Sequence, residues 1–322
     1  MTRTAADPAP GLPAAGPAPA LMAGLLWGLL AAVIWASYSV LARLAVKAGL
    51  SPGDLTLLRF APGALIMLPF VWRWCQQSGW RDLAGIGWRR GLVLSLLAGP
   101  GFSLLFMTGF TLAPLAHGAV VAPAFQMLTG LTLAALIAHQ RWTRESAIGA
   151  GCVLLGLACM GGDSLLHGEG RMTLLGDALF AAAGVCWGCF GALSRRWQVD
   201  PLRVTGVVVV LSFLMFAPGF VLLADWQRLA AAGPGMLALQ IVFQGLGAGL
   251  VAVLAFSRAA ALLGSGRAAF FGALVPGAAA LLAIPVLGEV PTGLQVLGIV
   301  AVVVGLLVAF GAVGMVLRRR VG

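Results

Sequence analysis

Long apolar runs alternate with short polar stretches along the chain after its first 20 residues. The runs approach or exceed the roughly 20 residues that a helix needs to cross the hydrocarbon core of a bilayer. Backbone polar groups in lipid must be satisfied within their own segment, so the pattern predicts helices. Ten spans are expected, namely 21–43, 55–74, 91–112, 117–138 and 146–163, followed by 176–194, 202–224, 235–257, 268–287 and 291–317.

The two series of five spans repeat each other. Pro52 and Pro201 are 149 residues apart, and Trp35 and Trp187 are 152 residues apart. Because each series has an odd number of spans, the second must enter the membrane from the opposite side. Further pairs at the 149-residue spacing are Thr143 with Thr292, Gly149 with Gly298, and Gly156 with Gly305; Arg43 and Arg195 share the 152-residue spacing.

The predicted fold is therefore an all-α membrane protein with ten transmembrane helices in two inverted five-helix repeats. An inverted pair offers a transporter two nearly equivalent conformations, one open to each face. The expected parts are a disordered cytoplasmic tail (1–20), a first repeat (21–163), an external linker (164–175), a second repeat (176–317) and a basic cytoplasmic tail (318–322).

Composition agrees with lipid as the main solvent, because 61% of the 322 residues are hydrophobic and only 9% are charged. The net charge of +10 would suit nucleic-acid binding, but the positions of the basic residues argue against it. Of the 20 basic residues, fifteen lie on one side with both termini, four on the other, and Arg59 inside a span. This asymmetry predicts a multi-pass protein of the inner (plasma) membrane with both termini in the cytoplasm.

Seven short motifs lie along the two halves: Trp35 within Ala32–Tyr38, Leu58–Phe60, Gly149–Gly156, Ala259–Leu263, Pro276, Gly288–Glu289 and Gly298–Gly305. These motifs resemble those of the EamA-type drug/metabolite transporter superfamily. The resemblance runs over about residues 21–317, and it implies a secondary transporter that exports amino acids or similar small metabolites. One departure is that Gln140 stands where the second repeat has Glu289.

Aromatic and polar residues inside the spans are the candidates for substrate binding. An unpartnered amide costs about 2–7 kcal/mol in an apolar medium, so buried glutamines need a ligand or a neighbouring helix. Arg59, placed about one turn inside the external end of its span, could attract a carboxylate or extend toward the interface. The aromatic rings could equally serve in packing. The candidates are Trp35, Tyr38, Arg59, Gln126, Trp187, Gln240 and Gln244.

Helix breaks are the second indicator of a binding site, because backbone freed within the membrane can face a cavity. Gly99, Pro100 and Gly101 lie in the middle of the third span. Pro123 and Pro276 could kink other spans and take part in gating, although proline is also tolerated as a purely structural bend.

Other chemistry has little support in the sequence. Lys47 is the only lysine and is not followed by Ser or Thr, so the chain cannot contain a Walker A motif. The histidines, His117, His139 and His167, are too far apart for a local metal motif, and no cofactor or metal is expected. No acidic residue is expected at mid-bilayer, which argues against a buried proton relay, and five of the ten acidic residues fall at external span ends. They are Asp54, Asp163, Asp177, Asp225 and Glu289.

The expected partners are a small-molecule substrate and the lipid bilayer, with no nucleic acid. The sequence leaves the oligomeric state open, with a monomer as the working assumption. Two other functions stay open at this point: a membrane-embedded enzyme that acts on lipid-linked substrates, and a channel or structural membrane subunit. An enzyme would need clustered acids, bases or metal ligands, which the pattern of one acid per loop does not predict.

Overall fold

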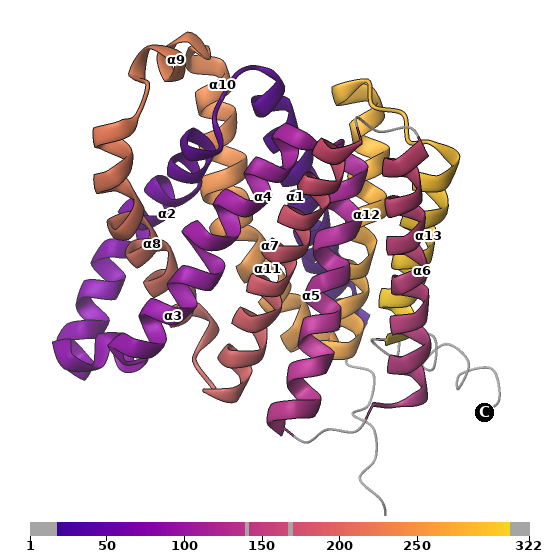
Figure 1. Ribbon diagram of the computed structural model, residues 1–322. Coiled ribbons are helices and arrows are strands. Elements are labelled where there is room, and N and C mark those ends of the chain that lie inside the picture. The colour runs from indigo at the N-terminus through magenta and orange to yellow at the C-terminus, as the bar shows by residue number, and fades with distance from the viewer. Residues whose placement is uncertain (1–17, 139–141, 167–169, 310–322) are drawn as a thin grey trace, which may run out of the picture.

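The computed structural model describes residues 18–138, 142–166 and 170–309, and every regular element in these ranges is helical (Figure 1). The first half contains α1 (Ala18–Lys47), α2 (Pro52–Ser78), η1 (Trp80–Gly85), α3 (Trp88–Ala98), α4 (Pro100–Leu112), α5 (Leu115–Ala138) and α6 (Arg144–Leu166). The second half contains α7 (Arg171–Arg196), α8 (Pro201–Leu223), α9 (Trp226–Ala231), α10 (Gly233–Gln240), η2 (Ile241–Val251), α11 (Ala252–Leu263), α12 (Ser265–Leu287) and α13 (Gly293–Ala309).

These helices form ten membrane spans. Nine stretches of the described chain are long and apolar enough to cross a bilayer, and α13 contributes a shorter one. α3 with α4 makes the third span, and α10, η2 and α11 together make the eighth. The expectation of an all-helical membrane protein with ten spans is confirmed.

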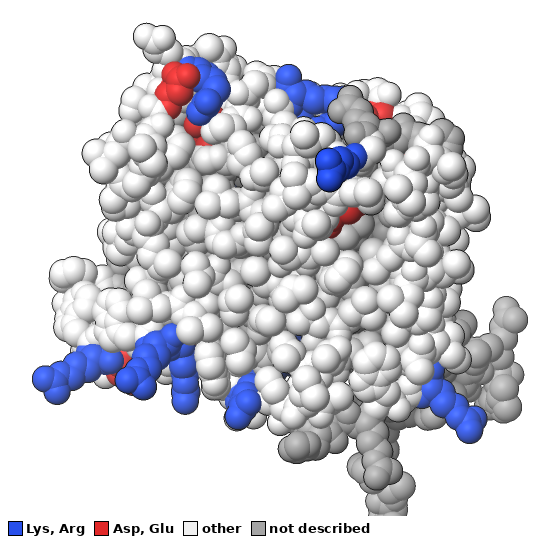
Figure 2. Space-filling model, in the orientation of Figure 1, with Lys and Arg blue, Asp and Glu red and all other residues white. Residues whose placement is uncertain are grey.

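Side chains are distributed as a bilayer requires. Figure 2 shows most charged side chains gathered toward the two ends of the molecule, and apart from one acidic patch near mid-height the face between them is uncharged. Large apolar residues such as Leu65, Leu155, Leu281 and Val300 are exposed to the surroundings. Below, the upper end means the end with α9, and the lower end the end with η1 (Figure 1).

Matching caps begin the second span of each half. Ser51 and Asp54 form a capping box at the start of α2, and the Asp200 side chain accepts from the Arg203 N–H at the start of α8. Pro52 and Pro201 occupy the first turns of these helices, where the missing proline N–H costs nothing. The repeated proline thus marks equivalent helix starts, one at the upper end and the other at the lower end.

The two halves pack on each other reciprocally. α1 packs on α11 and α12, and in return α7 packs on α4 and α5. α2 packs on α8 and η2, and α8 packs on α2 and α3. Each contact made by a helix of one half therefore has an equivalent contact made by the corresponding helix of the other half. The corresponding helices run in opposite directions, since α1 runs toward the upper end and α7 toward the lower end. This is the predicted pair of inverted five-helix repeats.

The fifth spans, α6 and α13, meet through glycines. A Cβ added to Gly149 would lie 2.6 Å from the Gly305 carbonyl oxygen, and one added to Gly156 would lie 2.8 Å from the Gly298 carbonyl oxygen. Because no side chain separates the backbones, the two helices approach closely, as small residues allow in membranes. The glycine pairs seen in the repeat are therefore packing positions.

The third and eighth spans are both interrupted, at corresponding places. Gly99 separates α3 from α4, and a Cβ there would lie 2.0 Å from Ser212 Oγ and 2.1 Å from the Ser95 carbonyl oxygen. In the eighth span the helix widens into the π-helical segment η2, which includes residue 248, the 149-residue counterpart of Gly99. π-Helical turns are frequently found at functional sites.

Some segment boundaries differ from those expected from hydropathy. α6 continues to Leu166 and α7 begins at Arg171, so the stretch between the repeats is shorter than 164–175. Ala18–Ala20 already belong to α1, and the rest of the expected tail, together with 318–322, lies outside the described residues. Gln140, His139 and His167 also lie outside them.

Candidate functional site

The interrupted spans meet α2 next to Arg59. Phe102 is the third residue of α4, just after the break, and its ring centroid is 5.6 Å from the Arg59 guanidinium carbon. In η2, a Cβ added to Gly245 would lie 2.8 Å from the Leu58 carbonyl oxygen, so this backbone packs directly on the turn that carries Arg59. Paired interrupted segments are the strongest structural indicator of a transporter's binding site.

Arg59 is buried rather than extended toward the interface. It is the eighth residue of α2, about 10 Å along the helix axis from its upper end. The side chain is only 6% exposed, and its guanidinium carbon lies 4.7 Å from the centroid of the Tyr38 ring. The capping box of Ser51 and Asp54 starts α2 before the predicted span 55–74, so Arg59 lies about two turns from the start of the helix.

The Arg59 guanidinium has hydrogen-bonding capacity to spare. Its Nε and Nη1 are buried and have no hydrogen-bond partner among the described residues. Cation–π contacts with Tyr38, Phe60 and Phe102 stabilise the charge, by about 0.5–2 kcal/mol each. An arginine within a membrane helix costs about 2.5–3.5 kcal/mol even on the mildest scale, so this one is expected to have a functional partner.

Aromatic rings from both halves surround this charge. Trp187 of α7 lies 4.9 Å from Phe102, measured between ring centroids, and Tyr38 stacks on Phe106 at 6.0 Å. Phe190, the repeat counterpart of Tyr38, contacts Trp187 at 5.4 Å. The site therefore combines one cation with an apolar, aromatic wall shared by the two halves.

Two glutamines of the eighth span complete the polar groups. Gln244 Nε2 donates to the Tyr38 carbonyl oxygen at 3.3 Å, and Gln240 Nε2 donates to the Leu41 carbonyl oxygen at 3.1 Å. The Oε1 atoms of both glutamines and the Tyr38 hydroxyl have no partner among the described residues. We call Tyr38, Arg59, Phe102, Trp187 and Gln244 the Arg59 site.

Not every residue expected at the site lies there. Trp35 packs on Phe256 of α11, with 5.4 Å between their ring centroids, and Gln240 lies one turn above Gln244. The Gln126 side chain is exposed on α5. α5 and α12 continue without interruption through Pro123 and Pro276, whereas Gly99 at the Gly99–Gly101 stretch does interrupt its span.

A second set of polar groups joins the halves at the upper end, above the Arg59 site. Glu289, in the link between α12 and α13, accepts from Arg43 Nε at 3.0 Å and from the Leu115 N–H at 2.9 Å. Lys47 Nζ lies 2.9 Å from the same carboxylate, and Arg43 also donates to the Phe110 carbonyl oxygen. One acidic side chain of the second half thus binds two helices of the first half, α1 and the start of α5.

Hydrogen bonds determine the protonation of Glu289. Burial raises its pKa, but the hydrogen bonds from the Leu115 N–H and from Lys47 and Arg43 outweigh this, so the pKa lies below its usual range. The carboxylate therefore remains charged at neutral pH and keeps its ion pairs.

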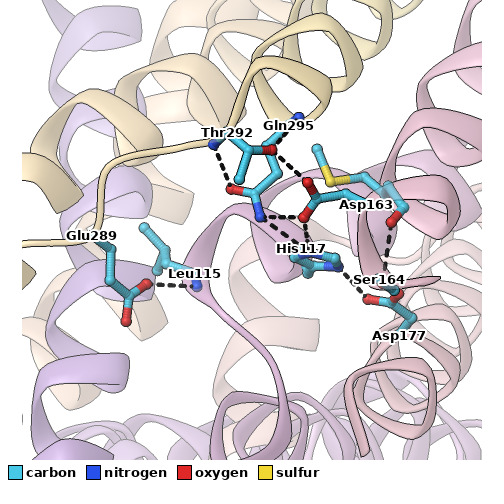
Figure 3. Close-up of polar contacts among 9 residues, drawn as sticks. Leu115, His117, Asp163, Ser164, Asp177, Glu289, Thr292 and Gln295 are labelled. Atoms are coloured by element: carbon cyan, nitrogen blue, oxygen red, sulfur yellow. Dashed lines mark hydrogen bonds and ion pairs between the residues drawn. The ribbon is translucent and has the colours of Figure 1, made fainter. Parts of the chain in front are cut away.

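Beside it, His117 lies between two carboxylates from different halves (Figure 3). Its Nδ1 is 2.8 Å from Asp177 Oδ1 on α7, and its Nε2 is 3.6 Å from Asp163 Oδ2 on α6. Gln295 Nε2 of α13 donates to Asp163 at 2.7 Å, and Thr292 Oγ1 donates to the same carboxylate. The network connects α5, α6, α7 and α13.

A third contact between the halves lies at the same end, where Arg228 Nε is 3.3 Å from Asp54 Oδ2. We call the Glu289, His117 and Asp54 contacts together the upper latch. A cavity of about 220 Å³ lies beside the first two, lined in part by Pro114, Ala280, Glu289 and Gln295.

The lower end is joined differently. Among the described residues, Arg203 Nη1 donates to the Ala84 carbonyl oxygen at 3.2 Å, and the Arg90 guanidinium lies 5.6 Å from the Trp197 ring centroid. Neither contact is an ion pair. The described side chains thus hold the halves together more firmly at the upper end than at the lower.

Sequence reasoning missed the upper latch. The acids were expected one per loop and scattered, whereas the fold brings Asp163 and Asp177 to opposite sides of His117. The available signal was the position of these residues at the same predicted membrane face. Within the described ranges, no group of three or more His, Cys, Asp or Glu side chains is arranged to hold a metal ion.

Comparison with known proteins gives three findings. The EamA-like transporter family matches residues 22–162 and 174–311, one match per half. The uncharacterized transporter YyaM of Bacillus subtilis (strain 168) is 23% identical over 225 residues, which are 69% of this chain and 73% of YyaM. A protein crystal structure with 23% identity has a TM-score of 0.55, covering 90% of this chain and 97% of its own, and supports the same fold.

Proposed function

The chain belongs to the EamA-like transporter family and is a membrane transporter of small molecules, and on this premise we propose that it exports amino acids or similar small metabolites by alternating access. The observation that carries the proposal is the reciprocal packing of two inverted halves around the Arg59 site. A solute bound between such halves can be exposed to either face when their roles are exchanged.

The difference between the contacts at the upper and lower ends supports alternating access. Ion pairs join the halves only at the upper end among the described contacts, so this conformation has its upper end closed. Hydrogen bonds to charged groups contribute about 1.5–3 kcal/mol each, which is enough to bias a two-state equilibrium strongly without making it irreversible. Opening the upper end requires these bonds to break together.

The charge distribution supports an orientation in the inner membrane. α1 begins and the described part of α13 ends at the lower end, where ten described arginines lie. Since basic residues favour the cytoplasmic side, we propose that the lower end and both termini face the cytoplasm. The ten are Arg73, Arg81, Arg89, Arg90, Arg144, Arg195, Arg196, Arg203, Arg258 and Arg267.

Counterflow in liposomes tests the proposal. Purified protein is reconstituted, the vesicles are loaded with one unlabelled amino acid or metabolite at a time, and entry of the same radiolabelled solute is followed. A carrier gives saturable entry with a transient overshoot in loaded vesicles. Entry that does not respond to the internal solute would indicate a channel, and no entry for any solute of a broad panel would reject the proposed substrates.

Variants test whether the site lies on the transport path. Trp187→Ala and Gln244→Ala should each reduce counterflow at least tenfold while expression is unchanged. Trp72→Ala is the matched control, because Trp72 is 55% exposed on the apolar surface of α2. Control-like rates in both variants would remove the proposed site.

A further inference from the structure

The buried charge of Arg59 indicates the chemical class of the solute. A guanidinium presents five N–H donors in one plane, and a carboxylate can accept two of them at once. Tyr38, Phe60 and Phe102 contact Arg59 as rings, and rings leave in-plane donors such as Nε and Nη1 unpaired. We propose that Arg59 binds the carboxylate of the transported solute, an inference that rests on the proposed carrier function.

The charge of the site favours a single carboxylate over a phosphate. The described spans bring one cationic side chain to the Arg59 site, and the remaining wall is aromatic or amide. A dianionic phosphate would keep a surplus negative charge in this apolar setting, whereas one carboxylate group matches and neutralises the single charge of Arg59. Neutralisation matters here because charges are costly to carry through a membrane.

The rest of the solute should be apolar and able to lie flat. Phe102 and Trp187 come from opposite halves and lie 4.9 Å apart between ring centroids, so a ring or branched chain would contact both. The Tyr38 hydroxyl and Gln244 Oε1 can serve one additional polar group. The shared chemistry is therefore a carboxylate on an apolar body, either an amino acid or a simple carboxylic acid.

Calorimetric titration of purified protein separates these features with three probes of one shape. 3-Phenylpropionate has the carboxylate alone, 2-phenylethylamine has the amine alone, and L-phenylalanine has both. We expect the two carboxylates to bind and the amine to bind at least 100-fold more weakly. Tighter binding of L-phenylalanine would identify the amino acid as the source of the carboxylate, and tighter binding of 3-phenylpropionate would identify the simple acid.

Arg59→Gln should weaken the binding of both carboxylates at least 100-fold, and Arg59→Lys, which keeps the charge but loses the planar fork, should give an intermediate loss. Arg73→Gln, the same change at an exposed position of the same helix, should bind as the unaltered protein does. Size-exclusion chromatography of each variant reports whether it is folded.

Three results would overturn the inference. They are unchanged carboxylate binding in folded Arg59→Gln, equally tight binding of 2-phenylethylamine, and no binding of either carboxylate by the unaltered protein. The carrier function is judged separately by counterflow. Arg59-dependent binding without counterflow would keep Arg59 as a carboxylate-binding residue and reject the carrier function. Counterflow that survives Arg59→Gln would keep the carrier function and reject the role of Arg59 in binding the transported solute.

Discussion

Arg43 Nε donates to Glu289 Oε1 at 3.0 Å, joining residues 246 positions apart and on opposite halves of the protein. The repeat gives each a counterpart at the other end, because Arg195 corresponds to Arg43 and Gln140 to Glu289. Glutamine cannot form the equivalent ion pair with arginine. The inverted symmetry is therefore broken at one pair of residues, in the direction that favours closure of the upper end.

The charge of Glu289 should make this contact sensitive only to acid. A carboxylate whose pKa is lowered by folding stabilises the folded protein above its ordinary value of 4.5, and this stabilisation is lost as the pH falls through the lowered pKa. We expect Glu289→Gln to unfold a few degrees earlier than the unaltered protein between pH 8 and 5, for a loss of about 1–2 kcal/mol. The difference should shrink below about pH 4.5. A difference that vanished near neutral pH in thermal unfolding would contradict the assignment.

Restoring the missing acid should create a latch at the lower end. Gln140 lies outside the described residues, and only its place in the repeat motivates the change. Gln140→Glu supplies a partner for Arg195, which should favour closure of the lower end and opening of the upper one. The measurement is labelling of an Ala280→Cys reporter, 6% exposed beside the upper cavity, by a membrane-impermeant maleimide. We expect labelling to rise about tenfold, and an unchanged rate would refute the symmetry argument.

Close packing of α6 on α13 should not tolerate side chains at its glycines. Gly305→Val places a Cβ 2.7 Å from the Gly149 carbonyl oxygen and should cost about 1–3 kcal/mol through overpacking. Gly151→Val is the control, since a Cβ there has no neighbour within 4 Å among the described residues. The unfolding temperature should fall by several degrees for Gly305→Val and should not change for Gly151→Val. Equal effects would show that helix propensity, rather than contact, decides the outcome.

Arg59 should cost the protein stability. An arginine within a membrane helix costs about 2.5–3.5 kcal/mol even on the mildest scale, and an apolar side chain of similar length avoids this cost. Arg59→Met should therefore keep or raise the unfolding temperature. Arg43→Met should lower it, because that guanidinium is bonded to Glu289 and Phe110. A large destabilisation by Arg59→Met would mean that Arg59 is a structural residue.

Hydropathy and the repeat were sufficient to predict the ten spans and their inversion, because lipid imposes one simple rule on every span. Polar or bulky residues inside spans are unusual, and for this reason the sequence also singles out Arg59, Tyr38, Trp187 and Gln244, which the structure brings together. It does not reveal which face of a helix points outward, so it could not predict that the Gln126 side chain is exposed on α5.

The upper latch depends on tertiary packing that no local pattern encodes. His117, Asp163 and Asp177 meet only because α5, α6 and α7 converge at one end. The π-helical segment η2 could not be predicted either, because its sequence from Ile241 to Val251 is typical of an ordinary apolar α-helix.

The most direct test of alternating access is paired labelling at both ends in one variant. Ala280→Cys reports the upper end, and Leu131→Cys, 149 residues earlier and half-buried on α5, reports the lower end. Each reporter is placed in the unaltered chain and in Glu289→Gln, and labelling of the native cysteines is subtracted. The account predicts that Glu289→Gln speeds labelling at Ala280→Cys and slows it at Leu131→Cys. Faster labelling at both ends, or no change at either, would contradict it.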